Sequence, residues 1–163
     1  QTGILVEGRG IGVDAVVADF IAGAAERLTL EAATDADIVL VEGQGSIIHP
    51  AYSGVTLGLM HGAMPHAMVL CAQPSRATVN GNPWLPIPPI ADMIRLYEQA
   101  MTYVRPSPVI AIALNTFDLT DAEARDAVDR VHGETGLPTT DPVRYDPAPL
   151  ANAIADFHRN RGP

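Results

Sequence analysis

Cysteine is almost absent from the 163-residue sequence, in which Cys71 is the only one, so no disulfide can form within the chain. Disulfides are rare in reducing compartments, and we therefore expect a cytoplasmic protein. Cys71 lies in the apolar stretch AMVLCA, and we interpret it as a small core residue rather than as a nucleophile.

Basic residues are also scarce, because 10 Lys and Arg stand against 19 Asp and Glu and give a formal net charge of -9. Proteins that bind nucleic acid or anionic membranes neutralise phosphates with clustered basic side chains. The charge balance therefore argues against nucleic-acid and membrane partners.

Long apolar runs and phosphate loops are missing too. No run approaches the roughly 18 apolar residues that a membrane-spanning helix requires, and no basic-then-apolar signal segment opens the chain. The phosphate-loop pattern G-x-x-x-x-G-K-[ST] is absent, since the glycine-rich stretch GRGIG from Gly8 to Gly12 has no lysine. The chain begins at Gln1 without a methionine, directly before an apolar run. We therefore expect the C-terminal part of a longer protein, with any phosphate loop upstream of Gln1.

The overall composition is that of a globular protein, with 47% hydrophobic and 18% charged residues. This length typically forms one domain, which we expect to span residues 1–163. Short apolar runs without polar alternation indicate strands buried on both faces; they cover residues 4–6, 38–41, 67–71 and 109–114.

Segments between these runs have helical spacing. Apolar stripes predict helices from Val13 to Ala24 and from Ile90 to Met101, and Leu150, Ile154 and Phe157 mark a last helix. The capping-box pattern TDAE at residues 120–123 predicts another helix start. The proline-rich stretch NGNPWLPIPP is expected to be extended without sheet pairing, with Trp84 either in a lid or oligomer contact or covering the core.

Alternating strands and helices predict an α/β domain with a parallel sheet and right-handed crossovers. Ligands of such sheets bind at the carboxyl ends of the strands, where the following loops converge. We therefore expect site residues in the segments directly after the apolar runs: residues 7–8, 42–46, 73–76 and 115–116.

The stretch VEGQGS places Glu42 at the predicted end of a buried strand, where Gly43 and Gly45 let the backbone approach a ligand closely. A carboxylate in this position can hold a metal ion or its water, as in phosphate-loop proteins. It can also act as a general base, because partial desolvation raises its affinity for protons. A third reading is that Glu42 only accepts hydrogen bonds from loop amides.

The next stretch, SIIHPAYSG, offers a titratable imidazole at His49 and hydroxyls at Tyr52 and Ser53. Histidine titrates near neutrality, so His49 can move protons during acyl or phosphoryl chemistry, or it can simply order the loop.

Further candidates follow the later strands. Asn115 ends the run VIAIALN, where an asparagine can contact a base or make an ordinary turn. Arg76 and Arg144 are the basic residues best placed on loops to hold a carboxylate or phosphate, although each can instead form a surface ion pair.

The sequence resembles one family over nearly its whole length. The stretches that carry the resemblance are QTGILVEG, VDAVVADFIAGAAE, VEGQGSIIHPAYSGVTLGLMHG, IALNT and ETGLPTTDPVR. They are similar to the C-terminal portion of the bacterial D-glutamate N-acyltransferases, long catalogued as a domain of unknown function. The resemblance is strongest from Glu42 to Gly62.

The resemblance implies a three-layer parallel sheet flanked by helices, like that of phosphate-loop NTPases and the dethiobiotin synthetase group. It also implies acyl transfer from acetyl-CoA, or a similar thioester, to the amino group of D-glutamate in D-amino-acid catabolism. Coenzyme A phosphates would occupy the phosphate loop. The residues on the family's motifs are Gln1, Thr2, Glu42, Gln44, Ser46, His49, Tyr52 and Ser53.

For this reaction we expect Glu42 or His49 as the base and the amides around Gln44 to Ser46 as oxyanion donors. Arg76 or Arg144 would hold the acceptor's carboxylates. The alternatives are a Mg-ATP- or Mg-GTP-dependent ligase or kinase, in which Glu42 positions Mg²⁺, and a noncatalytic nucleotide-binding module; the acyltransferase itself requires no metal. We further expect a homo-oligomer that acts on a small amino-acid substrate.

Overall fold

The computed structural model describes residues 4, 6, 8 and 10–161, with the backbone alone at Asp14. The chain forms two compact units. Unit 1 comprises Gln1–Pro65 and Tyr103–Arg105, and unit 2 comprises His66–Thr102 and Pro106–Pro163. The expectation of a single domain over residues 1–163 stays a prediction.

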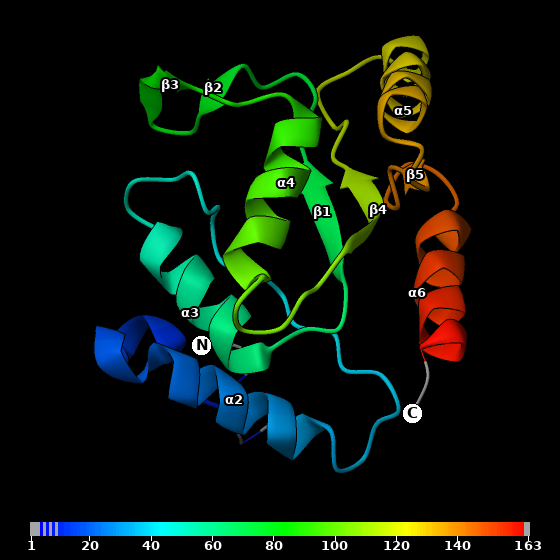
Figure 1. The fold of residues 1–163 in the computed structure, drawn as a ribbon. Coiled ribbons are helices and arrows are strands. Elements are labelled where there is room, and N and C mark those ends of the chain that lie inside the picture. The colour runs from blue at the N-terminus through cyan, green and yellow to red at the C-terminus, as the bar shows by residue number, and fades with distance from the viewer. Residues whose placement is uncertain (1–3, 5, 7, 9, 162–163) are drawn as a thin grey trace. The chain divides into compact units, whose positions relative to one another are not determined.

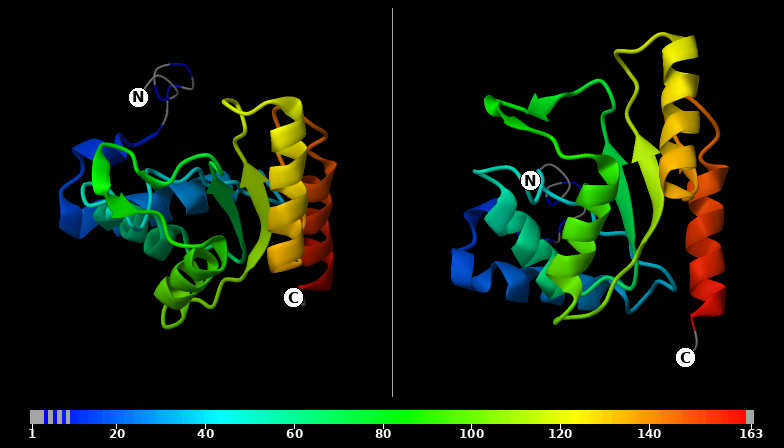
Figure 2. Two further views of the ribbon diagram at one scale, coloured as in Figure 1. Left: turned by 90° about the horizontal axis from the view of Figure 1, so that it is seen from above. Right: turned by 45° about the horizontal axis from the view of Figure 1, so that its top comes forward.

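Unit 2 is built on a parallel sheet of β1 (Met68–Ala72), β4 (Val109–Leu114) and β5 (Thr139–Thr140), in the order β1-β4-β5 (Figure 1). The arrows of β1 and β4 run in the same direction in both views of Figure 2. The strands predicted at residues 67–71 and 109–114 are confirmed to within one residue at either end. The central strand β4 is buried at four of its six residues, as expected for a strand with a neighbour on each side.

Helices α4 (Ile90–Met101), α5 (Asp121–Thr135) and α6 (Ala148–Asn160) flank this sheet (Figure 1). All of them were predicted from apolar spacing or capping. The predicted capping box is present, because Thr120 accepts from the amide of Glu123 while the Glu123 carboxylate accepts from the amide of Thr120. Helix α4 begins and ends at the predicted residues, and its last residue, Met101, is fully buried.

A small hairpin follows β1, in which β2 (Thr78–Val79) pairs antiparallel with β3 (Asn82–Pro86). The predicted absence of sheet pairing in the proline-rich stretch is therefore wrong. Proline is tolerated here because β3 has a partner on one side only, so an amide on its other side is not needed. The reading of Trp84 as a cover for the core is also wrong, since its side chain is 73% exposed.

Unit 1 contains two packed helices, α2 (Ile21–Ala32) and α3 (Ser53–Ala63), which lie next to each other in Figure 2. Two short 3-10 turns, Val13–Ala15 and Ala18–Phe20, precede α2. The helix predicted from Val13 therefore begins only at Ile21. Glycines on α3 allow the helices to approach closely: a Cβ atom on Gly62 would lie 2.0 Å from the carbonyl oxygen of Ala22.

The predictions of strands at residues 4–6 and 38–41 are wrong. Ile4 and Val6 are helical, and the amide of Gly8 donates to the carbonyl of Ile4 as in a helical turn. Residues 38–41 form no strand, and Leu40 is 79% exposed. A strand requires a hydrogen-bonding neighbour, and the part of unit 1 that the structure describes offers no other strand.

Cys71 also differs from its prediction. It is exposed rather than a core residue: side chains alternate between the two faces of a strand, and β1 buries Leu70 on one face while Cys71 points to the other. Among the described residues, no helix has both the length and the apolar character needed to cross a bilayer.

The close approach of α2 and α3 gives a first prediction. Gly62→Ala forces a methyl group against the backbone of α2, so we expect it to lower the free energy of unfolding by about 2–3 kcal/mol. The matched control is Gly54→Ala on the same helix, where a Cβ atom meets nothing within 4 Å and alanine favours the helix. Urea unfolding followed by circular dichroism measures both. Equal midpoints for the two variants would contradict this packing.

Candidate functional site

In unit 1 the loop after Glu42 is folded tightly onto the start of α3. Gly45 adopts a φ of +61°, and a Cβ atom there would lie 2.5 Å from the Cβ of Tyr52, so this position requires glycine. The buried hydroxyl of Thr56 lies 2.6 Å from the carbonyl oxygen of Gln44 and 2.9 Å from that of Tyr52. One side chain on α3 thus ties both ends of the loop together.

The predicted residues Ser46, His49 and Ser53 are joined within this loop by short-range contacts. The amide of His49 donates to the carbonyl of Ser46 at 3.0 Å, and the amide of Ser53 donates to the carbonyl of His49 at 2.9 Å. The rings of His49 and Tyr52 lie 4.5 Å apart between centroids. The structure therefore brings together the unit 1 residues that the sequence predicts from Gln44 to Ser53.

The imidazole of His49 has a defined tautomer in this arrangement. The amide of Ala51 donates to Nδ1 of His49 at 3.1 Å. Nδ1 must then carry a lone pair, so the proton of the neutral ring lies on Nε2. In this tautomer Nε2 is a hydrogen-bond donor, and Nδ1 can take up a proton only if its hydrogen bond from the amide of Ala51 is broken.

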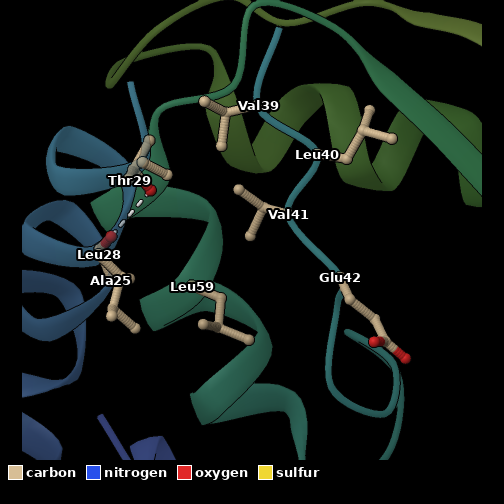
Figure 3. Close-up of a pocket in the computed structure, with 9 residues that line it drawn as sticks. Ala25, Leu28, Thr29, Val39, Leu40, Val41, Glu42 and Leu59 are labelled. Atoms are coloured by element: carbon tan, nitrogen blue, oxygen red, sulfur yellow. Dashed lines mark hydrogen bonds between the residues drawn. The ribbon is translucent and has the colours of Figure 1, made fainter. Parts of the chain in front are cut away.

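Glu42 lies at the rim of an apolar pocket of about 240 Å³ within unit 1. Figure 3 shows the Glu42 carboxylate turned away from the side chains of Val41 and Leu59, which line the pocket. Glu42 is exposed, so the predicted position at the end of a buried strand, with its desolvation, is wrong. Its carboxylate is instead accessible from solvent beside the glycine-rich turn.

In unit 2, polar side chains gather where β1 and β4 end, as predicted for the carboxyl edge of a parallel sheet. The hydroxyl of Ser75 donates to Asp118 at 2.7 Å, and the side-chain amide of Gln73 donates to the same carboxylate oxygen at 3.2 Å. The bond from Ser75 is the main reason why the pKa of Asp118 is lowered, and the nearby charge of Arg76 adds to it. Arg76 therefore stands at this edge beside a carboxylate that stays ionised.

A buried carboxylate, Asp141, joins the loops after β4 and β5. Asp141 is only 3% exposed. Oδ2 accepts from the amide and the hydroxyl of Thr116 at 2.9 and 2.5 Å, and Oδ1 accepts from the amides of Val143 and Arg144 at 2.9 and 3.0 Å. Burial alone would raise the pKa of Asp141, but these hydrogen bonds outweigh it and lower the pKa to about 2.

Arg144 takes part in the same arrangement. Its Nη2 atom donates to the carbonyls of Thr116 and Leu119 at 2.8 and 2.9 Å. The guanidinium thus has a structural role, and binding of a substrate carboxylate by Arg144 stays a prediction. Asn115 is exposed next to this network, and its Oδ1 accepts from the amide of Phe117 at 3.3 Å.

Sequence reasoning missed Asp141 and Asp118, because each lies far along the chain from a residue that it holds, whereas Ser75 lies in the segment 73–76 where site residues are expected. The sequence signal available for Asp141 is a position directly after the run PTT, which is too short to stand out as a strand. The predicted residues Gln1 and Thr2 lie outside the described residues. Within the part of the chain that the structure describes, no group of three His, Cys, Asp or Glu side chains could hold a metal ion.

A parallel sheet with helical crossovers and polar side chains at its carboxyl edge places the protein in the α/β class. A family model described as a domain of unknown function, "DUF1611_C P-loop domain", matches residues 1–151. The chain therefore belongs to the DUF1611 family, within its C-terminal P-loop domain.

Similar proteins agree with this assignment. A D-glutamate N-acetyltransferase of Tritonibacter scottomollicae is 39% identical over 159 residues, which cover 95% of this chain and 46% of that protein. A protein of the same name from Pseudoalteromonas sp. is 40% identical over 146 residues, covering 88% of this chain and 43% of that protein. The chain thus spans about half the length of the curated relatives that it matches.

A solved structure shows the same fold. The crystal structure of a DUF1611 family protein from Anabaena variabilis matches with a TM-score of 0.89 and 39% identity. The match covers 95% of this chain and 46% of that chain. The predicted family and the predicted fold class, a parallel sheet flanked by helices in a P-loop domain, are confirmed.

The network around Asp141 gives a second prediction. Asp141→Asn replaces one acceptor oxygen by the NH2 of a side-chain amide, which is a donor and would face other donors. We therefore expect the free energy of unfolding to fall by about 2–3 kcal/mol at pH 7. Asp156→Asn on the exposed side of α6 is the control and should have little effect.

The pH dependence tests the same carboxylate. A pKa lowered to about 2 means that ionised Asp141 stabilises the fold above the ordinary aspartate pKa of about 3.9. This stability is lost as the pH falls through the folded-state value. Urea unfolding of the wild type and of Asp141→Asn should therefore converge between about pH 5 and pH 2. A difference that stays constant over this range would contradict the assigned pKa.

Proposed function

We propose that the complete protein transfers an acetyl or similar acyl group from acetyl-CoA to the amino group of D-glutamate. The observation that carries the proposal is about 40% identity, over 88–95% of this chain, to two proteins named D-glutamate N-acetyltransferase. The loop from Glu42 to Ser53 supports it, because an acid, an imidazole and a glycine turn lie together there.

The reaction joins the acceptor nitrogen to the acyl carbon and breaks the carbon–sulfur bond, so that the thiolate of coenzyme A leaves. An ammonium group cannot attack, so a base must first remove a proton. We assign this role to Glu42, because its carboxylate is exposed beside the glycine-rich turn. His49 is the weaker candidate, because its Nδ1 already accepts from Ala51.

The tetrahedral intermediate carries a negative charge on the former carbonyl oxygen. Preorganised amide donors stabilise such a charge, since they need no reorganisation during the reaction. The turn from Gly43 to Ser46 is a suitable source of these donors, because Thr56 fixes its carbonyl at Gln44 and Tyr52 fixes the space beside Gly45. Substitution of Gly45 by a larger residue would displace this turn.

The acceptor D-glutamate carries carboxylates, which call for a cationic partner. Of the two predicted arginines, Arg144 is already engaged within unit 2, because its guanidinium donates to two backbone carbonyls. Arg76 is exposed at the carboxyl edge of the sheet in unit 2. We place the reaction in D-amino-acid catabolism and in the cytoplasm.

Glu42→Gln tests the assigned base. The variant keeps the size of the side chain but cannot take a proton, so kcat with acetyl-CoA and D-glutamate should fall by about 10²- to 10⁴-fold. The control is Glu26→Gln, which changes an exposed acid on α2 of the same unit. Release of coenzyme A thiol, followed with a thiol reagent, measures the rate. Normal turnover by Glu42→Gln would remove Glu42 from the mechanism.

Calorimetry distinguishes the transferase from a Mg-nucleotide enzyme. The complete protein is titrated with coenzyme A and, separately, with Mg-ATP. We expect heat from coenzyme A binding. Tight binding of Mg-ATP with no response to coenzyme A would overturn the transferase in favour of the ligase or kinase.

A further inference from the structure

The apolar pocket of about 240 Å³ in unit 1 is lined by α2, by α3 and by the segment 39–42 (Figure 3). Its most buried lining residues are Ala25 on α2 and Leu59 on α3, which are 3% and 8% exposed. A Cβ atom on Gly62 of α3 would lie 2.8 Å from the Cβ of Ala25. The pocket therefore reaches down to the close contact between the two helices.

The lining offers apolar surface with a single charge at the rim. Of the described residues that line the pocket, Glu42 alone is charged, and in Figure 3 its carboxylate points away from the neighbouring side chain of Val41. The hydroxyl of Thr29 already donates to the carbonyl of Ala25 at 2.8 Å. A polar group would lose its hydration in such a pocket without compensation, so the fitting occupant is apolar. Any polar end of this occupant would lie at the rim, beside Glu42.

The size of the pocket sets a second condition on its occupant. A dry apolar cavity of roughly 150 Å³ holds one benzene molecule, which has six carbon atoms. A pocket of about 240 Å³ therefore has room for an acyl chain of about six carbons. Acetyl has only one methyl group to bury, and the side chain of D-glutamate ends in a carboxylate, so neither of them fills this apolar space.

We propose that the pocket binds the acyl chain of the thioester donor, and that the protein therefore transfers acyl groups longer than acetyl. The proposal rests on the proposed function for the reaction itself. The hydrocarbon chain lies between α2, α3 and the segment 39–42, and the thioester carbonyl lies at the rim, beside Glu42 and the glycine-rich turn. The acceptor amine approaches from solvent, where the exposed carboxylate of Glu42 can take its proton.

Isothermal titration calorimetry on the complete protein tests the pocket with acetyl-CoA, butyryl-CoA, hexanoyl-CoA and decanoyl-CoA. Each methylene that enters the pocket should tighten binding by up to about fourfold, the gain expected for burying one methylene group. The gain should stop near six carbons, because a longer chain extends beyond the pocket. With D-glutamate as the acceptor, kcat/KM for the same donors should follow the affinities.

Two substitutions on α2 should shift the preferred chain length in opposite directions. Ala32→Leu narrows the pocket, so the affinity for hexanoyl-CoA relative to acetyl-CoA should fall by about tenfold. Leu28→Ala enlarges the pocket and should move the preference toward decanoyl-CoA. A loss of stability alone would not produce opposite shifts, and thermal unfolding verifies that each variant is folded.

Ala33→Leu is the matched control. It makes the same change one residue later, at an exposed position outside the pocket lining, and should keep the wild-type ratio of affinities. Equal changes of the ratio in Ala32→Leu and Ala33→Leu would overturn the proposal. Equal affinity of the wild type for acetyl-CoA and hexanoyl-CoA, as expected if another part of the complete protein fills the pocket, would also overturn it.

The two proposals can fail separately. If the affinity for the donor depends on chain length and on Ala32, but no acyl group is transferred to D-glutamate, the pocket stands and the proposed reaction falls. If acetyl transfer occurs and chain length affects neither binding nor kcat/KM, the reaction stands and the acyl pocket falls.

Discussion

The carboxylate of Asp141 is the constraint on which the carboxyl edge of the sheet in unit 2 depends. A buried charge costs free energy unless hydrogen bonds replace its hydration, and here amide and hydroxyl donors from Thr116, Val143 and Arg144 do so. Because these donors come from the loops after two neighbouring strands, satisfying the charge also fixes the loops. Hydrogen bonds to an ionised group contribute about 1.5–3 kcal/mol each, more than neutral ones. These hydrogen bonds therefore hold the loops at this edge of the sheet in place.

In unit 1 the loop after Glu42 is also held in place, but without a buried charge. The loop is closed by a hydroxyl on α3, at Thr56, and by the contact of Gly45 with Tyr52, and α3 is itself set by the close approach of Gly62 to α2. The catalytic candidates Glu42 and His49 therefore lie on a loop whose geometry depends on small residues. Glycine is required here for space at two positions, and not for flexibility. A preorganised loop of this kind suits oxyanion stabilisation, which demands donors that are fixed in advance.

The sequence predicted unit 2 well because its signals are local. The strand β4 and the helix α4 were placed at their exact residues, and the capping box at Thr120 was recognised from side chains only three residues apart. The wrong predictions concern features that depend on distant partners. Cys71 was expected in the core, but it points to the face of β1 opposite to buried Leu70, and the sequence does not show which face other elements cover. Asp141 was missed for the same reason, since its donors at Thr116 lie 25 residues away.

The run at residues 38–41 shows most clearly what an apolar pattern does and does not establish. Its residues have the composition of a buried strand, yet Leu40 is largely exposed and no strand forms. The apolar composition indicates only that burying these side chains would be favourable. A strand also needs a neighbouring strand with matching backbone donors and acceptors. The proposal that Glu42 belongs to a site does not depend on that strand. It depends on the turn that follows, which Thr56 and Gly45 hold in place whether or not residues 38–41 are paired.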